Sequence, residues 1–83
     1  MEEVKQFILD YLQREYDLPA DVDILSFNYV KEGYIDSLGL LHFIALIEDE
    51  FGIAFTDEEL GSDDVKIVGR MIALIEKKAS ERR

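Results

Sequence analysis

The stretch that decides the fold is residues 36–52, DSLGLLHFIALIEDEFG. Apolar residues recur in it at intervals of three and four, which is the spacing of one face of an α-helix. Gly52 follows the last of them and is typical of a helix C-terminus. We therefore expect a helix from Ser37 to Glu50 or Phe51. Its core-facing residues are Leu40, Phe43, Ile44, Ile47 and Phe51.

A second apolar stripe is displaced around the same helix. A four-helix domain can bury a doubly apolar helix at its centre, so a second core face is one explanation of the stripe. The other is an exposed surface on which a partner docks. The stripe begins next to Ser37, and this position favours docking. Its residues are Leu38, Leu41 and Ala45.

Three acids, Glu48, Asp49 and Glu50, occupy the last turn of this helix. The helix dipole is negative there, so each carboxylate should cost about 0.3–1 kcal/mol of stability. Solubility would explain one such acid. Three in a row, with more acids at residues 57–59, indicate a recognition surface, and we take Glu48 as its most useful acid.

Three further helices are expected around this one. The first covers residues 2–16, a short third one follows a capping-box pattern, and the last carries an apolar stripe at helical spacing. Their ends are marked by Asp17 and Pro19 after the first, Thr56-Asp57-Glu58-Glu59 and Gly61 around the third, and Asp63 or Asp64 as the cap of the last. The stripe of the last helix is Val65, Val68, Met71, Ile72 and Ile75.

Residues 17–35 show no sustained period, and we expect a long loop whose apolar side chains pin it to the core. A loop of this length usually carries function or conceals an element. The chain is therefore expected to be one all-α domain over residues 1–83, a four-helix bundle with a core of about 2–77 and a frayed tail at 78–83. The pinning side chains are Ile24, Leu25, Phe27, Tyr29 and Val30.

Charge and composition exclude several classes of protein. The net charge is −10 over 83 residues, and residues 32–65 hold ten acids and no Lys or Arg. Such a surface repels nucleic acid and attracts basic partners, although acids also serve solubility. Without Cys there is no disulfide and no thiolate metal site, and no apolar run reaches the roughly 18 residues of a membrane span. The acidic start is not a signal peptide. We expect a cytoplasmic monomer without nucleic-acid partners, membrane insertion or a metal.

Ser37 lies where the expected helix begins. A phosphate ester on its hydroxyl would lie beside unpaired backbone N–H groups at the positive end of the dipole. The alternative is that Ser37 is the N-cap, a common role for serine. No Glu or Gln stands three residues after Asp36 or Ser37, so a capping box does not support this alternative.

Residues 33–38, Gly-Tyr-Ile-Asp-Ser-Leu, resemble the phosphopantetheine attachment motif of acyl carrier proteins, whose core is Asp-Ser-Leu. The resemblance runs from the first helix through Ile75 and includes the acidic helix end and the Thr-Asp-Glu-Glu segment. It implies a right-handed four-helix bundle with a short third helix and a long first loop. It also implies a 4'-phosphopantetheine arm, attached to Ser37 by a phosphopantetheinyl transferase that uses coenzyme A and Mg²⁺. Asp36 would match the acid that helps this transferase.

The resemblance further implies that an acyl or aminoacyl cargo hangs as a thioester on the thiol of the arm, which explains thioester chemistry in a chain without Cys. A loading ligase or transferase and downstream synthases would be its partners, in fatty acid, other lipid, polyketide or other specialised biosynthesis. Gly39 and His42 stand where carriers of bulk fatty-acid synthesis usually have acids. The pattern is similar to specialised stand-alone carriers, and we expect Gly39→Asp with His42→Glu to leave the fold intact and to improve loading by a fatty-acid malonyl transferase.

Three other functions compete with this one. An enzyme is disfavoured because Ser37 and His42, five positions apart on a helix, point about 140° apart, and no catalytic residue is assigned. A calcium loop at residues 21–32 is rejected, since Leu25 stands where a ligand is needed and Ser26 where a glycine is. The third is an unmodified protein–protein interaction module of the same fold, and only modification of Ser37 separates it from a carrier.

Overall fold

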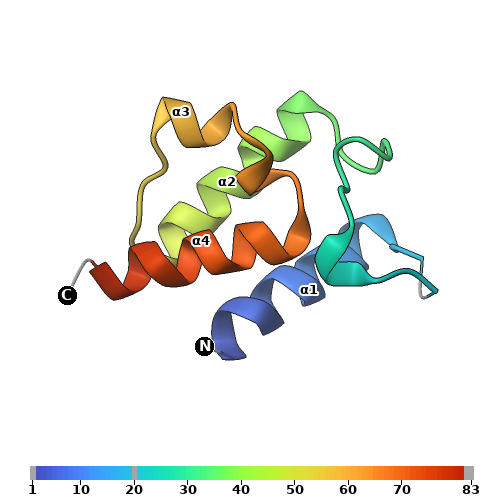
Figure 1. The fold of residues 1–83 in the computed structure, drawn as a ribbon, viewed down its shortest axis with the longest axis horizontal. Coiled ribbons are helices and arrows are strands. Elements are labelled where there is room, and N and C mark those ends of the chain that lie inside the picture. Colours follow the sequence, from blue (N-terminus) through green and yellow to red (C-terminus); the bar gives the residue numbers. More distant parts are fainter. Residues whose placement is uncertain (1, 20, 82–83) are drawn as a thin grey trace.

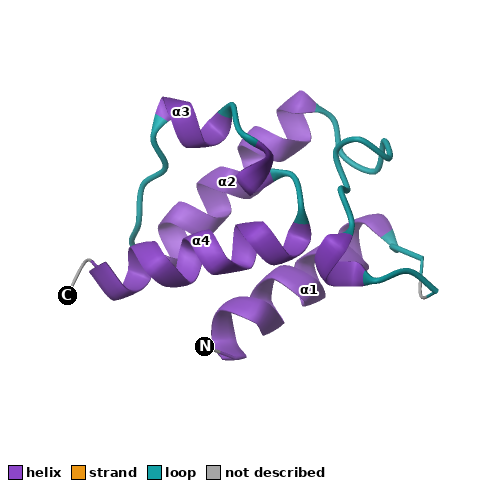
Figure 2. Ribbon diagram, in the orientation of Figure 1, coloured by secondary structure: helices purple, strands orange, loops and turns teal. Residues whose placement is uncertain are grey.

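Four α-helices and two short 3-10 turns build the protein, in a computed structural model that describes residues 2–19 and 21–81. In chain order they are α1 (Glu2–Tyr16), η1 (Ile24–Ser26), α2 (Ser37–Phe51), α3 (Asp57–Leu60), η2 (Asp63–Val65) and α4 (Val68–Glu81). Figure 1 shows α4 crossing in front of α2, with α1 below them and the short α3 on the opposite side. The described part of the chain contains no strand, only an isolated bridge between Asn28 and Ile67 (Figure 2). The predicted all-α fold is confirmed.

Local signals set most of the helix ends. Gly52 ends α2 in a left-handed conformation (φ 64°), which glycine adopts without strain, and its N–H donates to the Glu48 carbonyl. Thr56 and Glu59 form the predicted capping box at the start of α3. Asp17 follows α1 with a positive φ of 50°, and its N–H donates to the Gln13 carbonyl at 3.0 Å. The predicted ends of the first three helices are therefore confirmed.

The start of the last helix was predicted wrongly. Asp63 and Asp64 do not cap it but form η2, where the Ser62 hydroxyl accepts from the Asp64 N–H at 3.1 Å. α4 begins at Val68, whose N–H donates to the Phe27 carbonyl at 3.0 Å. A backbone acceptor in the distant first loop thus replaces the side-chain cap that the sequence suggested.

The tail also differs from the expectation of fraying at 78–83. Lys78, Ser80 and Glu81 belong to α4, and Lys78 pairs with Glu59 of α3 at 2.8 Å. This cross-helix ion pair gives the last turns of α4 a contact that the sequence pattern did not reveal. Residues 82 and 83 lie outside the described part of the chain.

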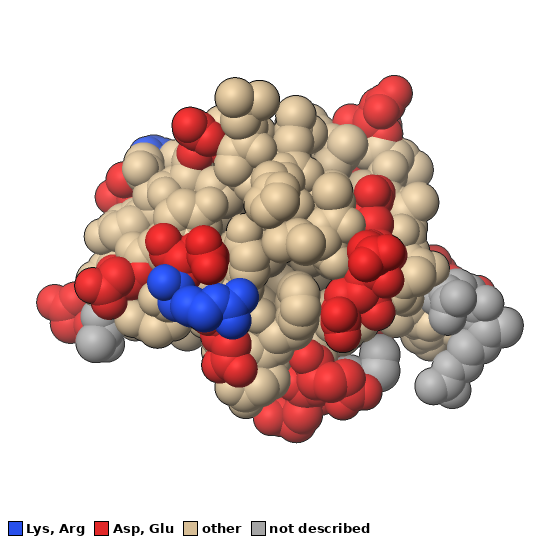
Figure 3. Space-filling model, turned by 180° about the vertical axis from the view of Figure 1, so that it is seen from behind, with Lys and Arg blue, Asp and Glu red and all other residues tan. Residues whose placement is uncertain are grey.

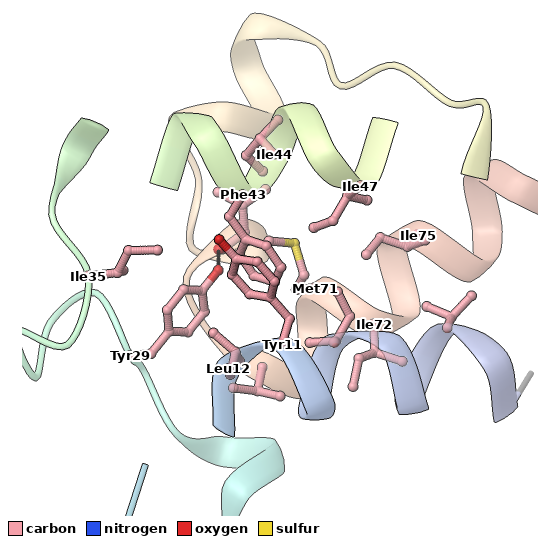
Figure 4. Packing of buried hydrophobic residues seen from close by; sticks show 14 of the residues in the cluster. Tyr11, Leu12, Tyr29, Ile35, Phe43, Ile44, Ile47, Met71, Ile72 and Ile75 are labelled. Carbon is pink, nitrogen blue, oxygen red and sulfur yellow. Dashed lines mark hydrogen bonds between the residues drawn. The ribbon is translucent and has the colours of Figure 1, made fainter. Parts of the chain in front are cut away.

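One apolar core joins the three long helices and the first loop (Figure 4). The ring of Tyr11 on α1 stacks on that of Phe43 on α2, with centroids 4.4 Å apart. Tyr29 of the loop is fully buried, and its hydroxyl donates to the Val65 carbonyl at 2.6 Å. The other buried residues are Val4, Ile8, Leu12, Leu18, Ile35, Ile44, Ile47, Phe55, Val65, Val68, Met71, Ile72 and Ile75.

The first loop is pinned to the bundle, as predicted, but not by every expected side chain. Tyr29 is buried, and Ile24, Phe27 and Val30 are partly buried against the core. Leu25 is 42% exposed, so its side chain is not one of the residues that pin the loop. A Cβ on Gly69 would lie 2.7 Å from the Leu25 carbonyl oxygen, so η1 and α4 approach at a position that only glycine allows.

Candidate functional site

Ser37 is the first residue of α2, and its side chain is exposed. The residue that caps the helix is Asp36, whose Oδ1 accepts from the Gly39 N–H at 2.7 Å. No residue that the structure describes makes a hydrogen bond to the Ser37 hydroxyl. The alternative explanation of Ser37 as an N-cap is therefore excluded, and the hydroxyl has no structural role.

This position suits a covalent phosphate ester. The first N–H groups of a helix have no partner within the helix, and the dipole there is positive. Asp36 satisfies only the Gly39 N–H, so the N–H groups of Ser37 and Leu38 stay available to an anion attached at residue 37. The exposed hydroxyl leaves room for a long arm. The residues around Ser37 thus fit a phosphopantetheine group, which supplies the thiol that carries the cargo.

The second apolar stripe of α2 is exposed, which rules out its explanation as a second core face. Leu38 is 79% exposed and Leu41 is 56% exposed, and Ala45 is exposed as well. In Figure 3, seen from the side on which α2 lies, a broad uncharged area has carboxylates along its edges. Leu38, Leu41 and Ala45, which we call the α2 strip, are therefore not part of the core.

Glu48 lies on α2 beyond this strip, and its side chain makes a hydrogen bond within the molecule. Its Oε2 accepts from the backbone N–H of Phe55 at 2.9 Å, and its side chain is partly buried. Asp49 and Glu50 beside it are exposed. The sequence singled out Glu48 as an acid for recognition but not its internal hydrogen bond, because a bond to a loop N–H seven residues ahead leaves no periodic signal.

Glu59 and Lys78 make a second polar tie, between α3 and α4. Glu59 Oε1 accepts from Lys78 Nζ and from the Thr56 N–H, both at 2.8 Å, and the Lys78 ammonium lies 5.7 Å from the centre of the Phe55 ring. The two charged side chains are only 23% and 16% exposed. Burial alone would raise the pKa of Glu59, but the hydrogen bonds from Lys78 and Thr56 outweigh it and lower this pKa. The sequence singled out Glu59 as part of the capping box, but neither Lys78 nor the ion pair between them.

Gly39 is half-buried rather than exposed, and the expectation that Gly39→Asp leaves the fold intact stays a prediction. A Cβ there would lie 2.9 Å from Ile35 Cγ1 and 3.1 Å from Asp36 Oδ1, so atoms would have to move. His42, by contrast, is exposed and tolerates replacement. The two departures from the family pattern therefore have different physical origins.

Two other features of the described residues bear on function. Within 2–19 and 21–81, no three His, Asp or Glu side chains gather as metal ligands would. No helix in those ranges has the length and apolarity to cross a membrane.

Comparison with known proteins bears directly on the site. The family model described as "Phosphopantetheine attachment site" matches residues 6–75, which include Ser37. An acyl carrier protein of Lactobacillus acidophilus is 30% identical over 74 residues, 89% of this chain and 90% of that protein. A D-alanyl carrier protein of Abiotrophia defectiva is 29% identical over 80 residues, 96% of this chain and 98% of that protein. No solved structure matches significantly. With its helical bundle and its exposed serine at the start of α2, the chain belongs to the acyl carrier protein family, whose members deliver acyl or aminoacyl groups on a covalently attached 4'-phosphopantetheine.

Proposed function

We propose that Ser37 is the residue that bears the 4'-phosphopantetheine arm of this carrier. The observation that carries the proposal is the state of its hydroxyl, which is exposed at the start of α2 and bonded to no described residue. Transfer forms a phosphodiester at the Ser37 oxygen and breaks the pyrophosphate bond of coenzyme A, adenosine 3',5'-bisphosphate leaves, and the hydroxyl proton goes to a base of the transferase. Asp36, which directly precedes Ser37 and caps α2, is the residue that we propose helps the Mg²⁺-dependent transferase.

The α2 strip is the proposed docking surface for partner enzymes. A partner must reach the arm on Ser37 and the protein around it, and Leu38, Leu41 and Ala45 offer apolar area next to that serine. Apolar area exposed in this way is typical of interaction sites. The partners that we propose are a phosphopantetheinyl transferase, a loading ligase or transferase, and downstream synthases. Glu48 adds negative charge beside the strip while it also holds the Phe55 N–H.

The cargo is proposed as an acyl or aminoacyl group used in specialised biosynthesis. One relative is a carrier of acyl groups and another of D-alanine. Exposed His42, in place of an acid, favours a specialised carrier over one that serves bulk fatty-acid synthesis. Carrier domains of this family are typically not catalytic, and we propose a single monomeric carrier domain without activity of its own. Its cytoplasmic location stays a prediction.

The decisive experiment is modification in vitro. Coenzyme A, Mg²⁺ and a broad-specificity phosphopantetheinyl transferase should add one phosphopantetheine to the wild type and none to Ser37→Ala, as intact-protein mass spectrometry would show. Ser26→Ala is the matched control, because Ser26 is also exposed, and it should be modified normally. Modification that persists in Ser37→Ala would move the site elsewhere. A wild type that takes no arm would instead favour the unmodified interaction module.

Mass spectrometry of the protein from its native host would then identify the cargo. An aminoacyl or acyl mass on the arm would name the class of loading enzyme directly, whereas a bare chain would argue against the carrier role in that host.

A further inference from the structure

Glycine at position 39 needs an explanation that the backbone does not give. The glycines with positive φ are Gly33 and Gly52, whereas Gly39 lies in the regular first turn of α2. Glycine is less stable than alanine within a helix, so an ordinary helical position should favour a side chain. What position 39 requires is therefore space rather than conformational freedom.

Three groups fill that space. A Cβ on Gly39 would lie 2.9 Å from Ile35 Cγ1, 3.1 Å from Asp36 Oδ1 and 3.2 Å from the Tyr16 hydroxyl. Ile35 and Asp36 belong to the segment that leads into α2. Tyr16 is the last residue of α1 and arrives from a different part of the fold.

Tyr16 is held firmly at its other end. Its ring lies against Tyr11, with centroids 6.3 Å apart, and Tyr11 in turn stacks on Phe43 of α2. Burial, and after it the neighbouring Tyr16, raise the pKa of Tyr11. The aromatic contacts therefore connect Tyr16 to the core, while its hydroxyl lies beside the first turn of α2.

We propose that Tyr16 is a positioning residue for phosphopantetheine transfer, closing over Gly39 and so fixing the turn that carries Ser37. The inference rests on the proposed role of Ser37. Because no described residue bonds to the Ser37 hydroxyl, its orientation depends on that turn alone. The conformation of that turn depends on two contacts. They are the hydrogen bond from the Gly39 N–H to Asp36 and the packing of Tyr16 beside Gly39. A side chain at position 39 would displace both Asp36 and Tyr16. Loss of the Tyr16 hydroxyl would leave the first turn of α2 less constrained.

A double-mutant cycle tests this coupling. Tyr16→Phe, Gly39→Ala and the double variant are compared with wild type in steady-state transfer from saturating coenzyme A, at varied carrier concentration and well below each melting temperature. Ser26→Ala is the control, since it removes an exposed hydroxyl of the first loop whose bond partner is Asp23, outside the attachment motif. The rate of hydrogen exchange at the amide of residue 39 reports whether its hydrogen bond to Asp36 persists in each variant.

Misplacement of the serine should lower kcat more than it changes KM for the carrier. We expect Gly39→Ala to lower kcat about tenfold and Tyr16→Phe about threefold, with faster exchange at residue 39 in both. In the Tyr16→Phe background Gly39→Ala should cost distinctly less, because one of its three close contacts is gone. The control should match wild type.

The outcomes separate this inference from the proposed function. Equal effects of Gly39→Ala in both backgrounds, or changes confined to KM or to the melting temperature, would overturn the role of Tyr16 while Ser37 remains the modified residue. A wild type without an arm, or an arm on Ser37→Ala, would overturn both.

Discussion

The start of α2 and the α3 segment lie at different places on one small bundle and are stabilised in opposite ways. At the start of α2, Ser37 makes no side-chain hydrogen bond within the described chain and Leu38 is mostly exposed. Around α3, by contrast, Glu48, Glu59 and Lys78 tie a four-residue helix to its neighbours. The side chains that partners would use are therefore exposed at the start of α2. Around α3, in contrast, some of the acids make hydrogen bonds and ion pairs within the molecule.

The comparison also divides the acids into two groups. Glu48, Glu59 and Asp64 have partners inside the molecule, the last with Arg70 at 2.8 Å. Asp49, Glu50, Asp57 and Glu58 are exposed. Some acids in residues 32–65 therefore stabilise the fold, whereas others are available to partners. Substitutions can distinguish the two groups.

The largest effect on the free energy of unfolding is expected for Glu48→Ala. It leaves the partly buried Phe55 N–H without an acceptor, a loss of about 1–3 kcal/mol. Removal of a carboxylate from the helix C-terminus stabilises the fold by about 0.3–1 kcal/mol, which offsets part of this loss. A net decrease in the free energy of unfolding is therefore expected in urea unfolding. Glu48→Gln keeps an acceptor and should be as stable as wild type. If Glu48→Ala proves equally stable but is loaded poorly by partners, Glu48 serves recognition alone.

A smaller effect, about 0.5–1 kcal/mol, is expected for Glu59→Gln, which keeps the cap of α3 and loses the charge facing Lys78. Because the pKa of Glu59 is lower in the folded state, its stabilising contribution is complete above the unfolded pKa of about 4.3. It is lost as the pH falls through the folded pKa. The difference in melting temperature between wild type and variant should therefore be constant above about pH 5 and shrink below about pH 4.

Lys78→Met is the partner control for that measurement, since it removes the same charge pair and keeps an apolar stem over Phe55. It should show the same dependence on pH. A difference between wild type and Glu59→Gln that stays constant down to pH 3 would mean that the ion pair contributes nothing.

The smallest effect on stability is expected for Leu41→Ala on the α2 strip, within about 0.5 kcal/mol, because the side chain is largely exposed. Loading by partner enzymes should nevertheless slow several-fold, measured as the rate of transacylation. His42→Ala, a neighbouring exposed change without loss of apolar area, should alter neither quantity. Loss of folding in Leu41→Ala would place Leu41 in the core and remove the contrast between the two regions.

Local signals made much of this architecture predictable. The bounds of α1 and α2 follow from apolar periodicity, and Gly52 and the Thr56–Glu59 box act within a few residues of the ends that they mark. Exposure of Leu38 was favoured because its stripe begins next to Ser37.

What could not be predicted depends on residues distant in sequence. The start of α4 is set by a carbonyl of the first loop at Phe27, which displaced the expected Asp63 or Asp64 cap. Gly39 was taken as a missing charge, because its contact with Tyr16 exists only after α1 and α2 have packed. Within the candidate site, the motif named Ser37 and Asp36, and the packing that supports them had no signature in the sequence.

The bond from Tyr29 to the Val65 carbonyl gives the molecule an optical reporter of its own. The chain has four Tyr and no Trp, so its near-ultraviolet signal comes mainly from phenol rings. Burial raises the pKa of Tyr29 above the usual tyrosine range, with a minor contribution from Tyr16. Phenolate at this residue therefore forms only as the first loop leaves the bundle, and the stability that the buried phenol contributes declines once the pH rises past about 10. The part of the phenolate absorbance that appears only above the pH at which ordinary tyrosines titrate thus follows, without any label, release of Tyr29 and its loop from the bundle.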